Sequence, residues 1–162
     1  MTGAERAGHV SRAGHAGHAL EGGRAGGTAD LTRADLVAWG AALGRDLAAP
    51  AVIALSGDLG AGKTTLVQAI CSGYGVLDPV TSPTFALVHQ YRGGPAMVFH
   101  LDLYRINSPA ELANLGWDEL LDANAVVLIE WPERAAGALP RDAMRLSLAH
   151  VPGAPDVRRL AW

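Results

Sequence analysis

Cysteine and lysine are nearly absent from the 162-residue sequence, where each occurs once, as Cys71 and Lys63. A single cysteine cannot form an internal disulfide, which excludes a disulfide-stapled scaffold and favours a reducing compartment. Charge is also sparse, since 18% of the residues are charged and the formal net charge is −3. This balance lacks the positive field that draws a protein to nucleic acid or to an acidic membrane surface.

Long hydrophobic runs are missing as well. The longest, residues 48–55, contains Pro50 and is far shorter than the roughly 18 residues that a membrane span requires. Near the N-terminus, glycine, histidine and arginine interrupt the chain every few residues, so the apolar middle of a secretory signal is not expected there. We therefore predict a cytoplasmic protein that does not contact a membrane.

The length predicts a single domain. Residues 1–28 consist of near-repeats of glycine, alanine, histidine and arginine with almost no large apolar side chains, the composition of a disordered tail. Its histidines (His9, His15 and His18) are compatible with metal binding, but a flexible spacer is the favoured interpretation. We expect the folded domain to cover residues 29–162.

The segment after the tail predicts an amphipathic helix followed by a buried strand. Order is expected from Leu31, where Thr32 and Asp35 resemble a capping box. Apolar residues then recur at helical spacing until Pro50 ends the helix. Residues 51–55 form a short continuous apolar run, typical of a strand covered on both faces. The apolar helix positions are Leu36, Trp39, Leu43 and Leu47.

Strands and helices alternate through the middle of the chain, which predicts an α/β fold with a mainly parallel sheet flanked by helices. A helix is expected over residues 62–72, and Ser108-Pro109-Ala110-Glu111 is a strong signal for another helix start. Further strands are expected at 85–91, 96–101 and 125–129, and a closing hairpin at 144–151 and 157–162.

Residues 57–64 carry the chemistry. They read Gly-Asp-Leu-Gly-Ala-Gly-Lys-Thr and fit the P-loop pattern between a strand and a helix. The glycines let successive amides face a phosphate, and the helix N-terminus adds partial positive charge. Lys63 is expected to reach the β- and γ-phosphates, and the Thr64 hydroxyl to ligate magnesium. Chance produces the pattern in about one such sequence in a thousand, so we predict a P-loop NTPase-like fold.

Such a loop needs a carboxylate at the end of a nearby strand to hold Mg²⁺. Asp102 follows the apolar run 97–101, and Glu130 follows 126–129. Each has a simpler explanation: Asp102 starts a turn, or Glu130 caps the helix before Pro132. Both candidates are retained as metal ligands and catalytic residues, since a magnesium-bound triphosphate needs at least one of them.

The nucleotide base is approached by elimination. Guanine-specific P-loop proteins use an Asn-Lys-x-Asp segment, but Lys63 already belongs to the P-loop. The Ser-Gly-Gly-Gln signature of transporter ATPases is absent, and the chain has no length for the lid domain of ring ATPases. ATP is therefore the expected nucleotide.

Four sequence blocks in order resemble the bacterial TsaE family, the small ATPase of the tRNA threonylcarbamoyladenosine pathway. The resemblance covers about residue 31 to the C-terminus. The blocks are 55–66 (LSGDLGAGKTTL), 82–85 (SPTF), 100–105 (HLDLYR) and 129–133 (IEWPE).

The resemblance implies an ATPase that works beside TsaB and TsaD and meets tRNA only indirectly. It implies catalytic roles for Lys63, Asp102 and Glu130, with Mg²⁺ held by Thr64 together with Glu130 or Asp102. It also places a sensing-loop threonine at Thr84, a tryptophan near the nucleotide at Trp131, and a basic contact at Arg158. The implied ATP-binding residues are Leu59, Gly60, Ala61, Gly62, Lys63, Thr64, Thr65, Thr84, Trp131 and Arg158.

Two other functions remain open at this point. A small-molecule kinase would use Asp102 as the base for an acceptor hydroxyl and would yield a phosphorylated metabolite. A nucleotide-dependent binding module would need neither Asp102 nor Glu130 as long as ATP binds. Release of free phosphate, with a rate that changes when partners are added, distinguishes the ATPase from both.

Overall fold

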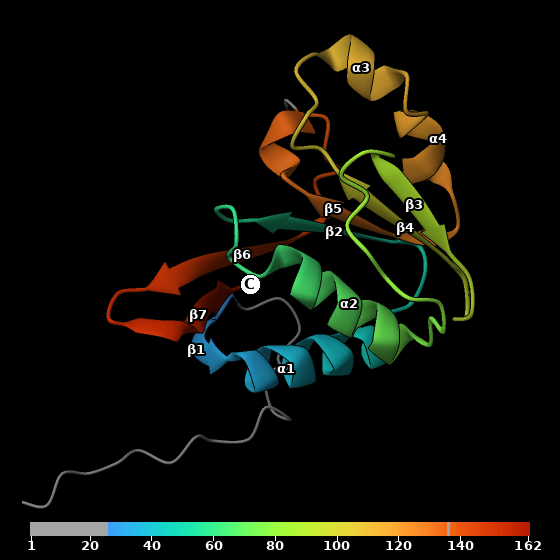
Figure 1. Ribbon diagram of the computed structural model, residues 1–162. Helices are drawn as coiled ribbons and strands as arrows, with labels where there is room; N and C mark the ends of the chain where they lie inside the picture. Colours follow the sequence, from blue (N-terminus) through green and yellow to red (C-terminus); the bar gives the residue numbers. More distant parts are fainter. Residues whose placement is uncertain (1–25, 136) are drawn as a thin grey trace, which may run out of the picture.

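The computed structural model describes residues 26–135 and 137–162, which form a seven-stranded sheet in the order β1-β7-β6-β2-β5-β4-β3 (Figure 1). The four central strands are parallel, whereas β3, β7 and β1 pair antiparallel with their neighbours. The strands are β1 (Thr28–Thr32), β2 (Ala51–Ser56), β3 (Val88–Tyr91), β4 (Met97–Asp102), β5 (Ala125–Glu130), β6 (Met144–Val151) and β7 (Ala154–Ala161).

Helices cover both faces of the sheet (Figure 1). On β5, Val126 and Leu128 join the core under α1 and α2, while Val127 and Ile129 join the core under α3 and α4. This alternation explains the continuous apolar run of a strand buried on two faces. The helices are α1 (Arg33–Asp46), α2 (Lys63–Tyr74), α3 (Pro109–Ala113), α4 (Trp117–Asp122) and the 3-10 turn η1 (Pro132–Ala135).

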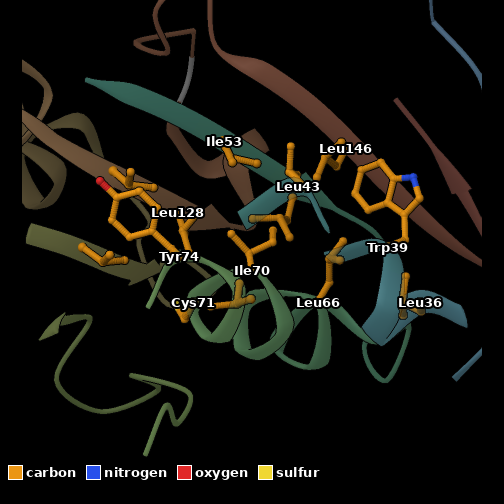
Figure 2. Close-up of a cluster of buried hydrophobic side chains, with 14 of the residues drawn as sticks. Leu36, Trp39, Leu43, Ile53, Leu66, Ile70, Cys71, Tyr74, Leu128 and Leu146 are labelled. Atoms are coloured by element: carbon orange, nitrogen blue, oxygen red, sulfur yellow. The ribbon is translucent and has the colours of Figure 1, made fainter. Parts of the chain in front are cut away.

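The larger core lies between the sheet and the pair α1 and α2. Figure 2 shows Leu43 and Ile70 from these two helices meeting Ile53, Leu128 and Leu146 of the sheet. The core fixes the position of α2, whose N-terminus follows the P-loop. It therefore sets where the loop stands relative to the ends of β4 and β5.

The predicted fold class is confirmed, as are most of its elements. The capping box of α1 is formed: the Thr32 side chain accepts from the backbone of Asp35, and the Asp35 carboxylate accepts from the backbone of Thr32. The cap at Ser108, with Pro109 in the first turn, also forms. A helix long and apolar enough to cross a membrane is not found in the described part of the chain.

The order that was expected to begin at Leu31 begins earlier. Strand β1 starts at Thr28 and pairs with β7 along its whole length. Gly27 also exchanges backbone hydrogen bonds of 2.8 and 2.9 Å with Trp162. The sequence of β1 contains one large apolar residue and does not by itself indicate a strand. Its extended conformation depends on pairing with β7, more than a hundred residues later in the chain. The remaining tail, with His9, His15 and His18, lies outside the described residues.

Two predicted strand boundaries are wrong. The strand expected at 85–91 begins only at Val88, because Leu87 has a positive φ of 65° that interrupts extended backbone. The strand expected at 157–162 begins at Ala154, because a tight turn at Pro152 and Gly153 joins it directly to β6. Gly153 has a φ of 77°, which glycine adopts without steric cost.

Candidate nucleotide site

The P-loop lies at the carboxyl end of β2, where residues 57–62 turn into α2. Gly57, Gly60 and Gly62 all have positive φ values, of 140°, 77° and 102°. A Cβ at Gly57 would lie 2.3 Å from the carbonyl oxygen of Leu148, so a side chain is excluded there by contact as well as by conformation. These glycines let the loop curl and leave the backbone amides at the start of α2 free of side-chain caps.

Two strand ends bring the predicted carboxylates to the same edge. Strands β4 and β5 are parallel neighbours, and their register sets Asp102 directly beside Glu130. Strand β5 also pairs with β2, with Glu130 beside Leu55 at the entrance to the loop. Parallel strands present their carboxyl ends at one edge of a sheet, where ligands bind in open α/β folds. The predicted convergence of loop and carboxylates is therefore realised.

A cavity of about 390 Å³ opens between the loop and these strand ends. Nearly all the predicted nucleotide and metal residues line it. Ala61 does not: it is fully buried in the core, and its backbone N–H donates to the carbonyl of Asp58. The lining consists of Leu59, Gly60, Gly62, Lys63, Thr64, Thr65, Ser82, Thr84, Asp102, Tyr104, Arg105, Glu130 and Trp131.

Lys63 is buried beneath Trp131 inside this cavity. Its Nζ donates to the carbonyl oxygens of Gly57 at 2.6 Å and Asp58 at 2.9 Å, and lies 3.9 Å from the centre of the Trp131 ring. Burial lowers the pKa of Lys63, and Glu130 is the largest of the carboxylates that oppose this shift. The loop carbonyls and the aromatic face compensate part of the desolvation of the ammonium.

Glu130 connects the loop to the sheet. Its Oε1 accepts from the Thr64 hydroxyl at 2.9 Å and lies 2.9 Å from Nε2 of His100. His100 and Glu130 are both buried. This arrangement puts a carboxylate and a hydroxyl at the amino end of α2, next to the sole lysine. The alternative in which Glu130 merely caps the next helix does not account for these contacts.

Asp102 is held by two donors. Ser82 donates its hydroxyl to Oδ2 at 3.2 Å, and the backbone N–H of Tyr104 donates to Oδ1 at 3.0 Å. The second contact is the turn-forming bond expected of an aspartate at a strand end. Asp102 therefore does start a turn, and it also lines the cavity.

The segment that carries Thr84 is anchored to the sheet. The Thr84 hydroxyl lies 2.8 Å from that of Ser82. At the base of the segment, the Tyr91 hydroxyl accepts from the backbone N–H of Thr81 and donates to its carbonyl, each at 3.1 Å. Through the Ser82 hydroxyl, this loop contacts Asp102.

Several residues at the cavity were not predicted as site residues. Tyr104 packs against Trp131 with ring centroids 4.9 Å apart, and Arg105 stacks on Phe85 at 4.6 Å. Trp131 itself has a positive φ of 59°, unusual for a bulky residue. The HLDLYR block already contained His100, Tyr104 and Arg105, but only long-range strand pairing brings them to Glu130 and Trp131.

Arg158 lies outside this cavity. It lines a neighbouring one, of about 330 Å³, that shares Gly60, Gly62 and Thr65 with the first. Its Nη1 donates to the carbonyl oxygens of Pro155 at 2.6 Å and Val157 at 2.9 Å. A contact between Arg158 and a nucleotide therefore stays a prediction. It would require the nucleotide to extend from the first cavity into the neighbouring one.

A larger cavity, of about 600 Å³, lies at the opposite end of the central strands, where Ala51 and Met144 stand. It contains no residue of the loop and none of the predicted site residues. Its size alone is not an argument for function, because the loop, the lysine and the carboxylates converge elsewhere.

The donor set near the loop fits Mg²⁺ bound to a triphosphate. Hydroxyl and carboxylate oxygens are hard ligands, and Mg²⁺ is usually held by one or two carboxylates together with substrate phosphates and water. Across residues 26–135 and 137–162, no group of three or more His, Cys, Asp and Glu side chains forms a ready-made metal cage. Thr64 together with Glu130 or Asp102 would thus hold the cation with the nucleotide.

Comparisons with known proteins give one consistent result. The model of the family described as threonylcarbamoyl adenosine biosynthesis protein TsaE matches residues 31–159. The tRNA threonylcarbamoyladenosine biosynthesis protein TsaE of Mycobacterium tuberculosis is 42% identical over 148 residues, covering 85% of this chain and 86% of that protein. The protein of the same name from Haemophilus influenzae is 36% identical, covering 68% and 70%.

The cyanobacterial relative from Nostoc, also named TsaE, is 46% identical over 99 residues, and the match spans 59% of this chain and 60% of that protein. Among solved structures, Bacillus subtilis YdiB superposes with a TM-score of 0.70 at 23% identity, covering 85% of this chain and 84% of YdiB. That likeness concerns the fold alone. The family match and the close relatives establish that this chain belongs to the TsaE family.

Proposed function

We propose that this chain binds ATP with Mg²⁺ and hydrolyses it as the ATPase component of tRNA threonylcarbamoyladenosine biosynthesis, in the cytoplasm. The observation that carries the proposal is the convergence in one cavity of Lys63, the Thr64 hydroxyl and the Glu130 carboxylate. The names of the relatives support the pathway. The lack of an Asn-Lys-x-Asp segment supports adenine over guanine.

Each group in the cavity has a role in this proposal. Lys63 exchanges its carbonyl partners for phosphate oxygens, and residues 59, 60 and 62–65 supply backbone amides to the phosphates. Bound Mg²⁺ would neutralise charge that develops on the transferred phosphoryl group. Thr64 and Glu130 would hold the cation, while Asp102 would orient the attacking water. Thr84 senses the γ-phosphate through the Ser82 contact with Asp102.

The nucleoside half of ATP would extend into the neighbouring cavity that contains Arg158. This cavity adjoins the first, because both are lined by Gly60, Gly62 and Thr65 of the loop and of the start of α2. Arg33 and Arg158 give it a cationic wall. Trp131 closes the other side of the loop over Lys63.

The proposed partners are TsaB and TsaD, which the family resemblance implies. The chain's own charge supports this arrangement, because a net charge of −3 gives no overall positive field that would attract tRNA. ATP hydrolysis then acts on the assembly, and tRNA is met through the partners.

The kinase alternative would use the same carboxylate. Each oxygen of Asp102 accepts one hydrogen bond, from Ser82 and from the backbone of Tyr104. Each therefore keeps a second acceptor site, which serves a water molecule and an acceptor hydroxyl equally well. The product of the reaction, and not this geometry, separates the kinase from the ATPase.

Calorimetry and phosphate release test the proposal. Wild-type protein should bind ATP with Mg²⁺ and release phosphate slowly, whereas Lys63→Ala should lose binding. Lys63→Arg keeps the charge but replaces the compact ammonium by a planar group, so it should fail too. Arg92→Ala removes an exposed charge elsewhere and is the matched control.

Two further measurements separate the alternatives. Asp102→Ala and Glu130→Ala should reduce phosphate release much more than ATP binding, and wild-type turnover by both variants would remove these residues from the mechanism. Threonylcarbamoyl transfer to tRNA, assayed with TsaB and TsaD in the presence and absence of this chain, should require the chain. A phosphorylated metabolite in place of free phosphate would establish a kinase.

A further inference from the structure

His100 stands next to the site without lining it. The residue belongs to β4, two positions before Asp102, and is 0% exposed. Its Nε2 lies 2.9 Å from Oε1 of Glu130 on the neighbouring strand β5. Its other ring nitrogen, Nδ1, is buried and has no hydrogen-bond partner. Burying an imidazole costs free energy unless its nitrogens form hydrogen bonds. The one hydrogen bond of His100, to Glu130, therefore needs an explanation.

The two nitrogens indicate where the proton sits. A hydrogen bond to a carboxylate requires that Nε2 carry the hydrogen, since a carboxylate only accepts. The Nε2–H tautomer leaves Nδ1 with an unused lone pair, and a buried acceptor without a partner is tolerated better than a buried N–H without one. The geometry therefore selects an imidazole that donates to Glu130.

This donor restricts the orientation of the carboxylate. Oε1 of Glu130 accepts from both His100 and Thr64, which belong to two different elements, β4 and α2. With Oε1 engaged twice, Oε2 is the oxygen that remains for a hydrated cation in the cavity. Without the His100 donor, only the Thr64 hydroxyl would restrain the side chain, and that hydroxyl is itself needed by the cation.

We propose that His100 is a positioning residue, which fixes the rotamer of Glu130 so that its free oxygen is presented to Mg²⁺·ATP. The proposal rests on the proposed function and assigns His100 no contact with the nucleotide. Loss of a group that hydrogen-bonds to a metal ligand and orients it typically lowers metal affinity or activity by about 10–100-fold. A residue needed only to fill space at this position would be replaced without such a loss by an apolar side chain of similar volume.

Three substitutions separate orientation from packing. His100→Gln places an amide N–H close to the position of Nε2, whereas His100→Asn places its polar group near Nδ1 and does not reach Glu130. His100→Leu fills space with no donor. His89→Asn is the matched control, because His89 is the register partner of His100 on β3 and asparagine keeps a polar group near Nδ1, the atom that contacts the Tyr91 hydroxyl.

The measurements are ATP binding by calorimetry with and without Mg²⁺, together with kcat and KM for ATP as a function of Mg²⁺ concentration. We expect the Asn and Leu variants of His100 to lose about 10–100-fold in kcat and in the gain in ATP affinity that Mg²⁺ provides. Their magnesium-free ATP binding should not change. Gln should retain wild-type values within about threefold, and thermal melting should show all variants folded.

Equal losses for Gln and Asn, or wild-type magnesium dependence in Asn and Leu, would overturn the proposal. A readout without nucleotide comes from nitrogen–proton correlation spectra of histidine-labelled protein, in which the His100 signals are identified by their loss in His100→Gln. A proton on Nε2 is expected. An Nδ1–H tautomer would leave Glu130 without this donor and would also overturn the proposal.

The outcomes distinguish this inference from the function on which it rests. If wild-type protein binds no ATP, both fail. If it binds ATP with Mg²⁺ but does not hydrolyse it, the ATPase proposal fails, and the magnesium-dependent affinities of the variants still decide the role of His100.

Discussion

The Lys63 ammonium is held by the loop to which it belongs. Two loop carbonyls and the face of Trp131 surround it, at 2.6, 2.9 and 3.9 Å. A buried cation without such partners would be strongly destabilising. The contacts keep the charge at the amino end of α2, so binding an anion requires an exchange of partners and little ordering of a flexible side chain.

Thr64 offers a test of how the hydroxyl connects loop and carboxylate. Thr64→Ala removes the hydroxyl that donates to Glu130, so phosphate release should fall by about 10–100-fold while ATP binding in the absence of Mg²⁺ is retained. Thr64→Ser keeps the hydroxyl and should lose little. Phosphate-release assays and calorimetry on the two variants check this, and equal activity of Ala and Ser would contradict it.

At the scale of elements, α1 and α2 approach each other through glycines. A Cβ on Gly44 would lie 2.1 Å from the carbonyl oxygen of Ile70, and a Cβ on Gly73 would lie 2.1 Å from that of Ala41. These contacts involve backbone atoms, which move only if the helices separate. Because α2 carries the P-loop at its N-terminus, close packing with α1 helps to set the position of the loop.

Gly73→Ala should therefore destabilise the protein by about 1–3 kcal/mol, the usual cost of overpacking, although alanine is the better helix former. Ser72→Ala, at the adjacent exposed position of α2, should change stability by less than about 0.5 kcal/mol. Urea unfolding followed by circular dichroism measures both. Unchanged stability of Gly73→Ala would show that the two helices separate at no cost.

Strand β1 is joined to β7 by an exposed ion pair, in which Arg159 donates to Asp30 through Nε and Nη2, each at 2.7 Å. The hydrogen bond from Arg159 lowers the pKa of Asp30 below its ordinary value of 3.8. A carboxyl group with a lowered folded-state pKa adds stability above its unfolded-state pKa, and that stability is lost as the pH falls through the lowered value.

Asp30→Asn should accordingly lower the Tm at pH 7 and show a smaller difference from wild type well below pH 3.8. High salt should shrink the difference at neutral pH, because the pair is exposed. Asp78→Asn, in the exposed loop after α2, provides the control. A Tm difference for Asp30→Asn that does not depend on pH would rule out the ion pair as its cause.

Local signals explain which elements the sequence could predict. The capping box of α1, the apolar run of β2 and the glycine pattern of the P-loop each depend on residues close in the chain, and each formed as expected. Strand β1 and the contact of His100 with Glu130 depend on pairing with distant strands. The turn at Leu87 depends on a backbone conformation that leucine disfavours, so the local sequence does not predict it.

For the whole molecule, the two hydrophobic cores lie on opposite faces of one sheet, and the candidate site stands at the sheet edge between them. The catalytic candidates Lys63, Asp102 and Glu130 come from α2, β4 and β5. The P-loop pattern predicted a nucleotide site at this edge, and the sheet register sets Asp102 beside Glu130 there.

The net charge of −3 predicts that the chain alone does not bind tRNA at physiological salt. Fluorescence polarisation with labelled tRNA should show no binding at physiological salt up to about 10 μM protein. At lower salt this concentration is enough to detect proteins that bind nucleic acid non-specifically. The assembly with TsaB and TsaD is the positive control. Tight binding by the isolated chain, weakened steeply by salt, would contradict the prediction.

The pairing of β1 with β7 also bears on how the protein is made. Thr28 of β1 lies opposite Ala161 of β7. During synthesis, β1 therefore cannot pair until β7, more than a hundred residues later in the chain, has left the ribosome. Sheets closed by such distant segments fold slowly. During synthesis, the border of the sheet formed by β1 and β7 would therefore stay open until the C-terminal residues of the domain emerge.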